Sequence, residues 1–169
     1  MKVFKNGFSL VELIVSLTVI LLLTGIGVTT FSGLLKAKKV STVKNELLSW
    51  VSLSKNLALT GQLPDGDLGL KFVKITFTSS NFLTDGIDDE NSSYNFFTKN
   101  FKNDLDIDNV NITVTNNGNG ISSFGFNKGT GRLLDVGGTM IDGPVRILVE
   151  SNGVTDSITI NDLGVINEK

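Results

Sequence analysis

Glu12 is the residue of this chain whose type and position most strongly indicate a functional role. It stands near the start of a long apolar stretch, and the nineteen residues that follow it, Leu13 to Phe31, carry no charge. A carboxylate costs about 2.5–3.5 kcal/mol at the centre of a bilayer and less toward the surface. The sequence therefore predicts that Glu12 either reaches the surface of an apolar layer or pairs with a cation inside it.

A second feature lies directly before this stretch. Lys2 and Lys5 belong to a short basic leader without acidic residues, and Gly7 precedes Phe8. At these residues and at Glu12 the chain closely resembles the type IV prepilin family, in which a peptidase cuts after the glycine, methylates the new amino-terminal Phe and leaves a Glu at the fifth mature position. The resemblance implies cleavage between Gly7 and Phe8, N-methylation of Phe8, and prepilin peptidase as a partner.

Cleavage would create a new cation, the Phe8 amine, in the same low-dielectric layer as Glu12. Because the two residues are four apart, an ion pair within one chain is one interpretation. The resemblance implies another, in which Glu12 of one subunit meets the amine of its neighbour and sets the axial register during assembly. A third interpretation is an interfacial Glu that is tolerated because its side chain reaches the surface.

The uncharged run predicts a membrane segment. At a rise of ~1.5 Å per residue it would span roughly 28 Å, close to the hydrocarbon thickness of a bilayer. The leader lysines place the N-terminus on the cytoplasmic side. We therefore expect a leader at residues 1–7 and a transmembrane and assembly helix at 8–35, in a single-pass protein of the cytoplasmic (inner) membrane. Its head lies outside and enters an extracytoplasmic filament after assembly. The alternative is an uncleaved signal anchor that holds a soluble domain outside.

Three glycines, Gly25, Gly27 and Gly33, lie inside or just beyond the apolar run. Each costs about 0.5–1 kcal/mol relative to Ala in a helix, so this part of the helix is the easiest to unwind. Many members of the resembling family carry a Pro in this stretch, which the glycines would replace. Close packing of helices through small residues is the other interpretation of Gly25 and Gly27.

Composition excludes several kinds of chemistry. The chain has no Cys and no His, which removes disulfides, thiol catalysis, imidazole acid-base chemistry and the commonest zinc ligands. The acidic segment Asp85 to Glu90 lacks the spacing of an EF-hand, so it predicts a solvated loop rather than a calcium site. The segment Gly125 to Arg132 lacks the Lys-Ser/Thr of a phosphate loop, and a hairpin turn suffices for it. Ser-Lys or carboxylate pairs stay open, but no motif supports them. We therefore expect no enzymatic activity, no metal site and no cofactor.

The charge balance bears on nucleic acid as a partner. The formal net charge is −2, and removal of Lys2 and Lys5 with the leader leaves 13 basic against 17 acidic residues, a net of −4. An acidic chain is not a general polyanion binder. DNA-binding members of the resembling group use arginines near the C-terminus, whereas the arginines here are Arg132 and Arg146. DNA capture during uptake is therefore kept as an alternative.

The elements that must position these residues begin with one long helix. Pro is absent from Phe8 to Leu63, so nothing interrupts a helix that continues past the apolar run. The part from 36 to 60 is predicted to lay one stripe on a sheet, and Gly61 and Pro64 end it. The lysines of this part, Lys44 among them, are predicted to lie mostly on the other faces of the helix. The residues of the stripe recur at spacings of three and four: Leu34, Ala37, Val40, Val43, Leu47, Trp50, Val51, Ser54, Leu57 and Ala58.

After the helix the hydrophobic period changes to two, and segments rich in Asn and Gly separate the strands. An antiparallel sheet over residues 68–169 follows, which with the helix forms one α+β head at 36–169, a type IV pilin-like fold. Loose similarities in the head point to the H-type minor pseudopilins and the FimT-type minor pilins. The predicted strands are Leu70–Phe77, Tyr94–Phe101, Val110–Thr115, Ile121–Asn127, Val145–Glu150 and Ser157–Asn161.

These features together predict a minor pilin or pseudopilin of a type IV pilus, type II secretion or competence filament. It would assemble with other pilin or pseudopilin subunits through its N-terminal helix. The alternatives are a DNA-binding minor pilin and a membrane-anchored surface binding domain that acts without a filament.

Overall fold

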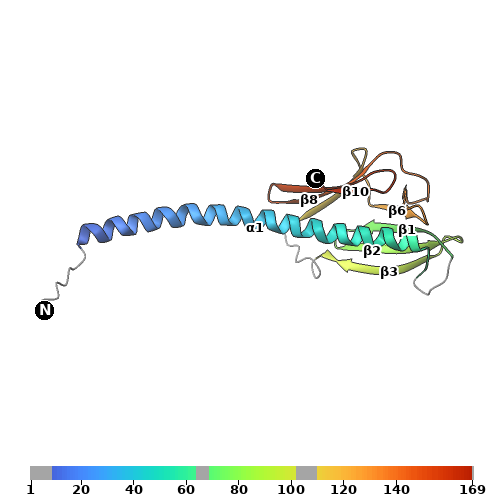
Figure 1. Ribbon diagram of the computed structural model, residues 1–169, viewed down its shortest axis with the longest axis horizontal. Helices are drawn as coiled ribbons and strands as arrows, with labels where there is room; N and C mark the ends of the chain where they lie inside the picture. The colour runs from blue at the N-terminus through green and yellow to red at the C-terminus, as the bar shows by residue number, and fades with distance from the viewer. Residues whose placement is uncertain (1–8, 64–68, 102–109, 169) are drawn as a thin grey trace. The chain divides into compact units, whose positions relative to one another are not determined.

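A computed structural model describes residues 9–63, 69–101 and 110–168 of the chain, and the side chains of 26–30 and 168 are outside that description. The chain divides into two compact units, Met1–Lys38 and Lys39–Lys169. The first secondary structure element, helix α1, covers Leu10–Thr60 (Figure 1). The predicted helix through the apolar run and on to residue 60 is therefore confirmed.

The end of α1 follows from one glycine. Gly61 has φ 72°, and its N–H donates to the Leu57 carbonyl at 3.2 Å. A left-handed residue directly after the last turn ends a helix at low cost only when it is glycine. The predicted cap at Gly61 is confirmed.

The second unit contains two five-stranded sheets, and every strand pair in them is antiparallel. In the first sheet the order is β3-β2-β1-β6-β7, formed by β1 Leu70–Phe77, β2 Asn81–Asp88, β3 Ser93–Asn100, β6 Ser123–Asn127 and β7 Leu133–Leu134. In the second the order is β10-β9-β8-β4-β5, formed by β4 Asn111–Asn116, β5 Asn119–Gly120, β8 Val145–Ser151, β9 Val154–Ile160 and β10 Ile166–Glu168.

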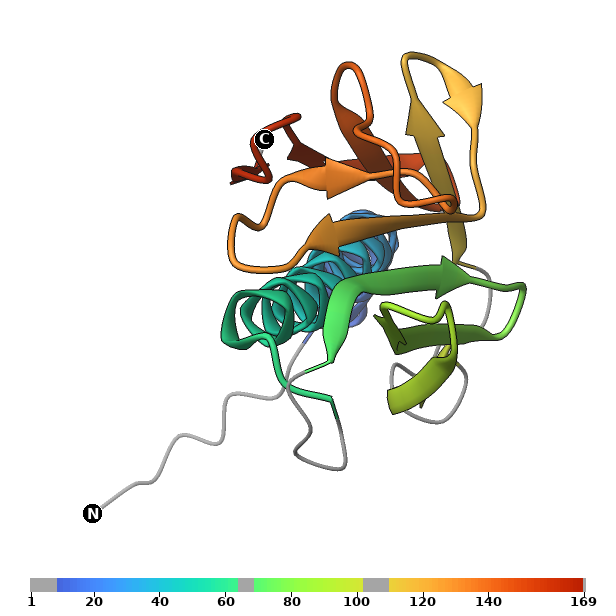
Figure 2. The same cartoon turned by 90° about the vertical axis from the view of Figure 1, so that its right-hand side faces the viewer.

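The α+β pilin-like fold class is confirmed, while the prediction of a single sheet is wrong. The chain leaves the first sheet after β3, pairs β4 with the later strand β8, returns for β6 and β7, and leaves again. In the second unit the C-terminal part of α1 lies beside both sheets (Figure 2). Two sheets cover more of a helix than one, and the main buried cluster takes side chains from the helix and from both sheets.

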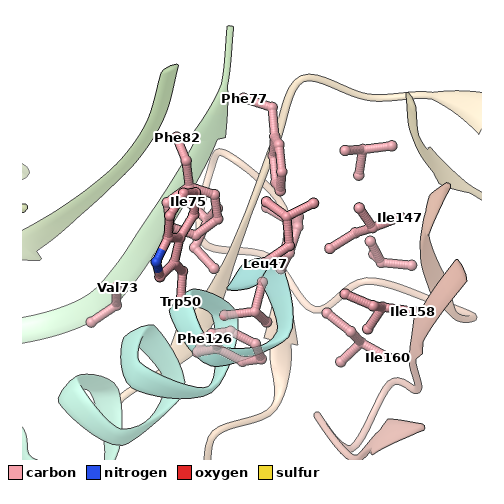
Figure 3. Close-up of a cluster of buried hydrophobic side chains, with 14 of the residues drawn as sticks. Leu47, Trp50, Val73, Ile75, Phe77, Phe82, Phe126, Ile147, Ile158 and Ile160 are labelled. Carbon is pink, nitrogen blue, oxygen red and sulfur yellow. The ribbon is translucent and has the colours of Figure 1, made fainter. Parts of the chain in front are cut away.

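In that cluster the rings of Trp50, Phe77 and Phe82 lie together, whereas Ile147, Ile158 and Ile160 come from the second sheet (Figure 3). Trp50 of α1 lies with its ring centroid 5.5 Å from that of Phe82 in the first sheet. Leu47, one turn earlier, faces Ile147 and Ile158 of the second sheet. All of these side chains are buried, so the two sheets pack on one stripe of the helix.

The stripe begins later than predicted. Val40 is 1% exposed, whereas Leu34 is 64% exposed and Ala37 is also exposed. Lys44, predicted on another face, is buried, and its Nζ lies 3.0 Å from Asp156 Oδ2. The prediction for Lys44 was wrong because its partner lies on β9, far along the chain. No local sequence pattern indicates that ion pair.

The acidic segment is also corrected. Asp85 and Asp88 belong to strand β2, and the turn that follows contains Asp89 and Glu90. Thr84 is fully buried, and its Oγ1 lies 2.9 Å from Ser54 Oγ on α1. The acidic side chains suggested a loop, whereas backbone pairing with β1 and β3 on both sides places the first half of the segment in a strand.

The turn predicted at Gly125 to Arg132 is confirmed. It joins β6 to β7, and Gly129 and Gly131 have φ values of 71° and 64°. Both values lie in the left-handed region that hairpin turns require.

Candidate functional site

The residues predicted to form the processing and assembly site lie at the start of the chain. Gly7 and Phe8 are outside the described residues. Glu12 stands in the first turn of α1 and is exposed. Gly25 lies in the same helix, and nothing is found within 4 Å of the position that a Cβ would take there. Gly27 lies in α1 as well, but its surroundings are not described.

A serine that the prediction passed over begins the helix. Ser9 Oγ accepts a hydrogen bond from the Glu12 N–H at 3.2 Å, and the Ser9 carbonyl accepts one from the Leu13 N–H at 3.1 Å. Ser9 is therefore the N-cap, and Glu12 occupies the third helical position, where a negative charge is favoured by the helix dipole. The Ser-x-x-Glu pattern of a capping box was the signal that could have found it.

The hydroxyl groups between Leu10 and Gly25 are all satisfied inside the helix. Ser16 Oγ donates to the Glu12 carbonyl and Thr18 Oγ1 to the Ile14 carbonyl, each at 2.8 Å. Thr24 Oγ1 donates to the Ile20 carbonyl at 2.6 Å. Such bonds let a hydroxyl enter an apolar environment without a partner on another chain. Glu12 is then the one side chain of this stretch that still needs a partner.

Around these polar groups the helix is apolar on every face. Every large apolar side chain from Leu10 to Leu23 is exposed, by 48–75%. A contiguous apolar surface of this kind marks contact with protein or with a membrane. Within the described part of the chain, the Glu12 carboxylate forms no salt bridge. Among the described residues, the geometry therefore combines a large uncovered apolar surface with a carboxylate at its beginning that has no salt-bridge partner.

Two further features are absent from the described residues. No group of three or more acidic side chains that could hold a metal ion occurs there. None of the helices in this part of the chain is long and apolar enough to cross a membrane.

Comparison with protein families addresses the same segment. Residues 4–28 match the prokaryotic N-terminal methylation motif. The chain carries a prepilin-type processing motif. This confirms the predicted resemblance, and the matched residues include Gly7, Phe8, Glu12 and the cap Ser9. No curated protein and no solved structure matches the chain.

The methylation motif supports a subunit of the type IV pilin or pseudopilin kind. It implies processing by the peptidase and assembly with other subunits of that kind, and it is the mark of a structural protein rather than of a known enzyme. The H-type and FimT-type similarities of the head stay predictions.

Proposed function

We propose that this chain is a minor pilin or pseudopilin of a type IV pilus, type II secretion or competence filament. Prepilin peptidase cuts between Gly7 and Phe8 and methylates the Phe8 amine. The observation that carries the proposal is the helical segment from Leu10 to Leu23, which lies within the methylation motif and exposes all its large apolar side chains. In an isolated protein this surface would be unstable in water, whereas a filament of packed helices covers it.

The proposed division of the chain has a leader at 1–7, a membrane and assembly helix at 8–35 and a head at 36–169. Before assembly the helix would hold the subunit in the cytoplasmic membrane, with the N-terminus inside and the head outside. The uncharged run after Glu12 and the lysines of the leader support this topology. The compact unit that begins at Lys39 supports the boundary of the head.

Glu12 sets the register of assembly in this proposal. Its backbone N–H is bound by the Ser9 cap, and its carboxylate forms no salt bridge with a described residue. In an apolar layer, a carboxylate without a cation is far less stable than an ion pair, and the Phe8 amine of a neighbour supplies the cation. A neighbour displaced along the axis would leave both charges unpaired.

Processing is tested first. Mass spectrometry of the protein from its native cells should find a methylated Phe8 at the N-terminus. Gly7→Asp should leave the leader attached, because a charged side chain blocks the cut, while Gly7→Ala serves as the milder control. A native chain that starts at Met1, or within residues 24–37, would contradict the proposal.

Assembly is tested by Glu12→Ala. Removal of the charge leaves membrane insertion unchanged or improved but eliminates the pairing with a neighbour's amine. The amount of subunit in sheared filaments should fall well below wild type, while the amount in the membrane does not. Equal incorporation of the variant and the wild type would disprove the register role.

A further inference from the structure

The turn between β2 and β3 carries a short motif that the packing of the head does not require. Asn91, Ser92 and Ser93 form the pattern Asn-x-Ser, in which the middle residue is not Pro. This pattern is the acceptor sequence for N-linked glycans, and it is expected on a surface loop of an exported protein. The structure meets that condition, because all three residues are exposed.

The geometry of the turn accounts for the asparagine but not for the serine two residues later. Asn91 has φ 65°, and its N–H donates to the Asp88 carbonyl at 3.1 Å, while the Asp88 N–H donates to the Ser92 carbonyl at 3.2 Å. Asn or Gly suits such a left-handed position in a turn. None of these bonds requires a hydroxyl at position 93, so the turn by itself leaves the second half of the motif unexplained.

The two side-chain groups that define the motif are open to a second molecule. Lys71 Nζ donates to Asn91 Oδ1 at 3.2 Å, which engages the oxygen of the amide and not its nitrogen. Asn91 Nδ2 and the Ser93 hydroxyl have no hydrogen-bond partner among the residues that the structure describes. An enzyme that reads the hydroxyl and uses the nitrogen as acceptor therefore displaces no contact of the head.

We propose that Asn91 carries an N-linked glycan, transferred from a lipid-diphosphate sugar donor after the head has crossed the membrane. The inference rests on the proposed function, which places the head outside. In the transfer, Asn91 Nδ2 forms a bond to C1 of the first sugar, and the bond between C1 and the phosphate oxygen of the donor breaks. The electron pair of that bond leaves with the lipid diphosphate, and Nδ2 gives one proton to a base of the transferase.

A second copy of the motif provides the internal comparison. Asn111, Ile112 and Thr113 form Asn-x-Thr, and Asn111 is exposed as well, but all three lie in β4 and pair with β8. Residues 89–92, in contrast, lie between β2 and β3 and belong to no strand. An enzyme reaches the backbone of an exposed turn more readily than that of a strand bonded within a sheet. We therefore expect modification at Asn91 and none at Asn111.

Tandem mass spectrometry of the chain from its native cells tests the inference. The peptide that contains Asn91 should carry the added mass of one or more sugars, located on that residue, and the peptide that contains Asn111 should not. An unmodified Asn91 would overturn the inference, whichever residue begins the chain. The N-terminal residue, read from the same sample, reports separately on the proposed function, because Phe8 supports it and Met1 contradicts it.

Three variants separate recognition of the motif from folding of the turn. Ser93→Ala keeps the asparagine but removes the hydroxyl, so the added mass should be lost, whereas Ser93→Thr should keep it. Asn91→Gly removes the amide but suits the left-handed position, so the mass should be lost while circular dichroism shows a folded head. Added mass that persists in Ser93→Ala would show that the motif is not what is read, and would equally overturn the inference.

Discussion

The two parts of α1 are both helical, but their apolar side chains differ in exposure. From Leu10 to Leu23 the helix is apolar on every face and exposed, whereas from Val40 to Ala58 it is amphipathic and its apolar stripe is buried by the chain's own sheets. The first part needs other molecules to cover it, and the second part needs none. The difference arises because the chain's own sheets cover the apolar side chains of the second part only.

Hydroxyl groups show the same contrast. Ser16 and Thr18 donate only to carbonyls of their own helix. Ser54 also donates to the carbonyl four residues before it, that of Trp50, but it makes a second bond with Thr84 of the first sheet. Because the proton of Ser54 is already used, Thr84 is the donor in that second bond. A hydroxyl in the head thus ties the helix to a sheet, and one in the N-terminal part does not.

The largest expected effect comes from separating the two parts. A chain shortened to begin at Lys36 loses the exposed apolar surface and keeps the buried stripe from Val40 onward. It should be soluble, monomeric and folded without a cofactor. Analytical ultracentrifugation and circular dichroism would check this, and an aggregated or unfolded product would show that the head depends on the first part.

Trp50→Ala in the shortened chain should lower the free energy of unfolding by about 3–5 kcal/mol, because it removes a buried ring that contacts Phe82. Urea unfolding followed by circular dichroism would measure the loss. Leu53→Ala is the control, since Leu53 is 47% exposed on the same helix and should cost much less. Similar losses for both would mean that the stripe is not what holds the helix.

Lys44→Ala should cost about 2 kcal/mol, less than a fully buried pair because the Asp156 side chain is 23% exposed. The loss arises because the carboxylate of Asp156 is left without its cation. The double variant Lys44→Met with Asp156→Leu should recover much of the loss, since no charge then remains unpaired. Urea unfolding of the three proteins gives the answer, and a double variant less stable than Lys44→Ala would rule out this origin.

Ser54→Ala should cost about 1 kcal/mol, because the buried hydroxyl of Thr84 loses its acceptor. Thr18→Val in the full chain, extracted in detergent, should leave the unfolding of the head unchanged, since Thr18 bonds only to its own helix. Thermal unfolding monitored by Trp50 fluorescence would compare them. A loss for Thr18→Val as large as that for Ser54→Ala would remove the contrast between the two parts.

The smallest expected effect is DNA binding by the shortened chain. Because the chain is acidic and has two arginines, we expect at most weak and strongly salt-dependent binding. A gel-shift titration at physiological salt measures it. Submicromolar binding that is lost on replacing Lys128, Arg132 and Arg146 would favour the uptake alternative over a structural subunit.

Local features of the fold were predictable from the residues. The helix to Thr60 and its Gly61 cap follow from the absence of Pro and from the conformational freedom of glycine, and the turn at Gly129 and Gly131 follows from the same freedom. The cap at Ser9 is equally local, since it follows from the Ser-x-x-Glu spacing of Ser9 and Glu12, but the prediction for Glu12 rested on its charge alone.

Nonlocal pairing was not predictable. The buried Lys44 pairs with Asp156, and the buried Thr84 of strand β2 makes a hydrogen bond with Ser54 of the helix. The partners are 112 and 30 residues apart. Local sequence patterns extend over one helix or strand, so they do not show that these residues meet.

By itself, the sequence determined the processing motif, the exposed apolar helix that follows it and the α+β class of the head, because each depends on residue type and short spacing. The division of the strands into two sheets, and the point at which the helix becomes buried, were decided by the tertiary structure. Both depend on which distant strands pair, as β1 does with β6 and β4 with β8. The local hydrophobic patterns of the strands are alike, so the packing of their side chains determines which strands pair.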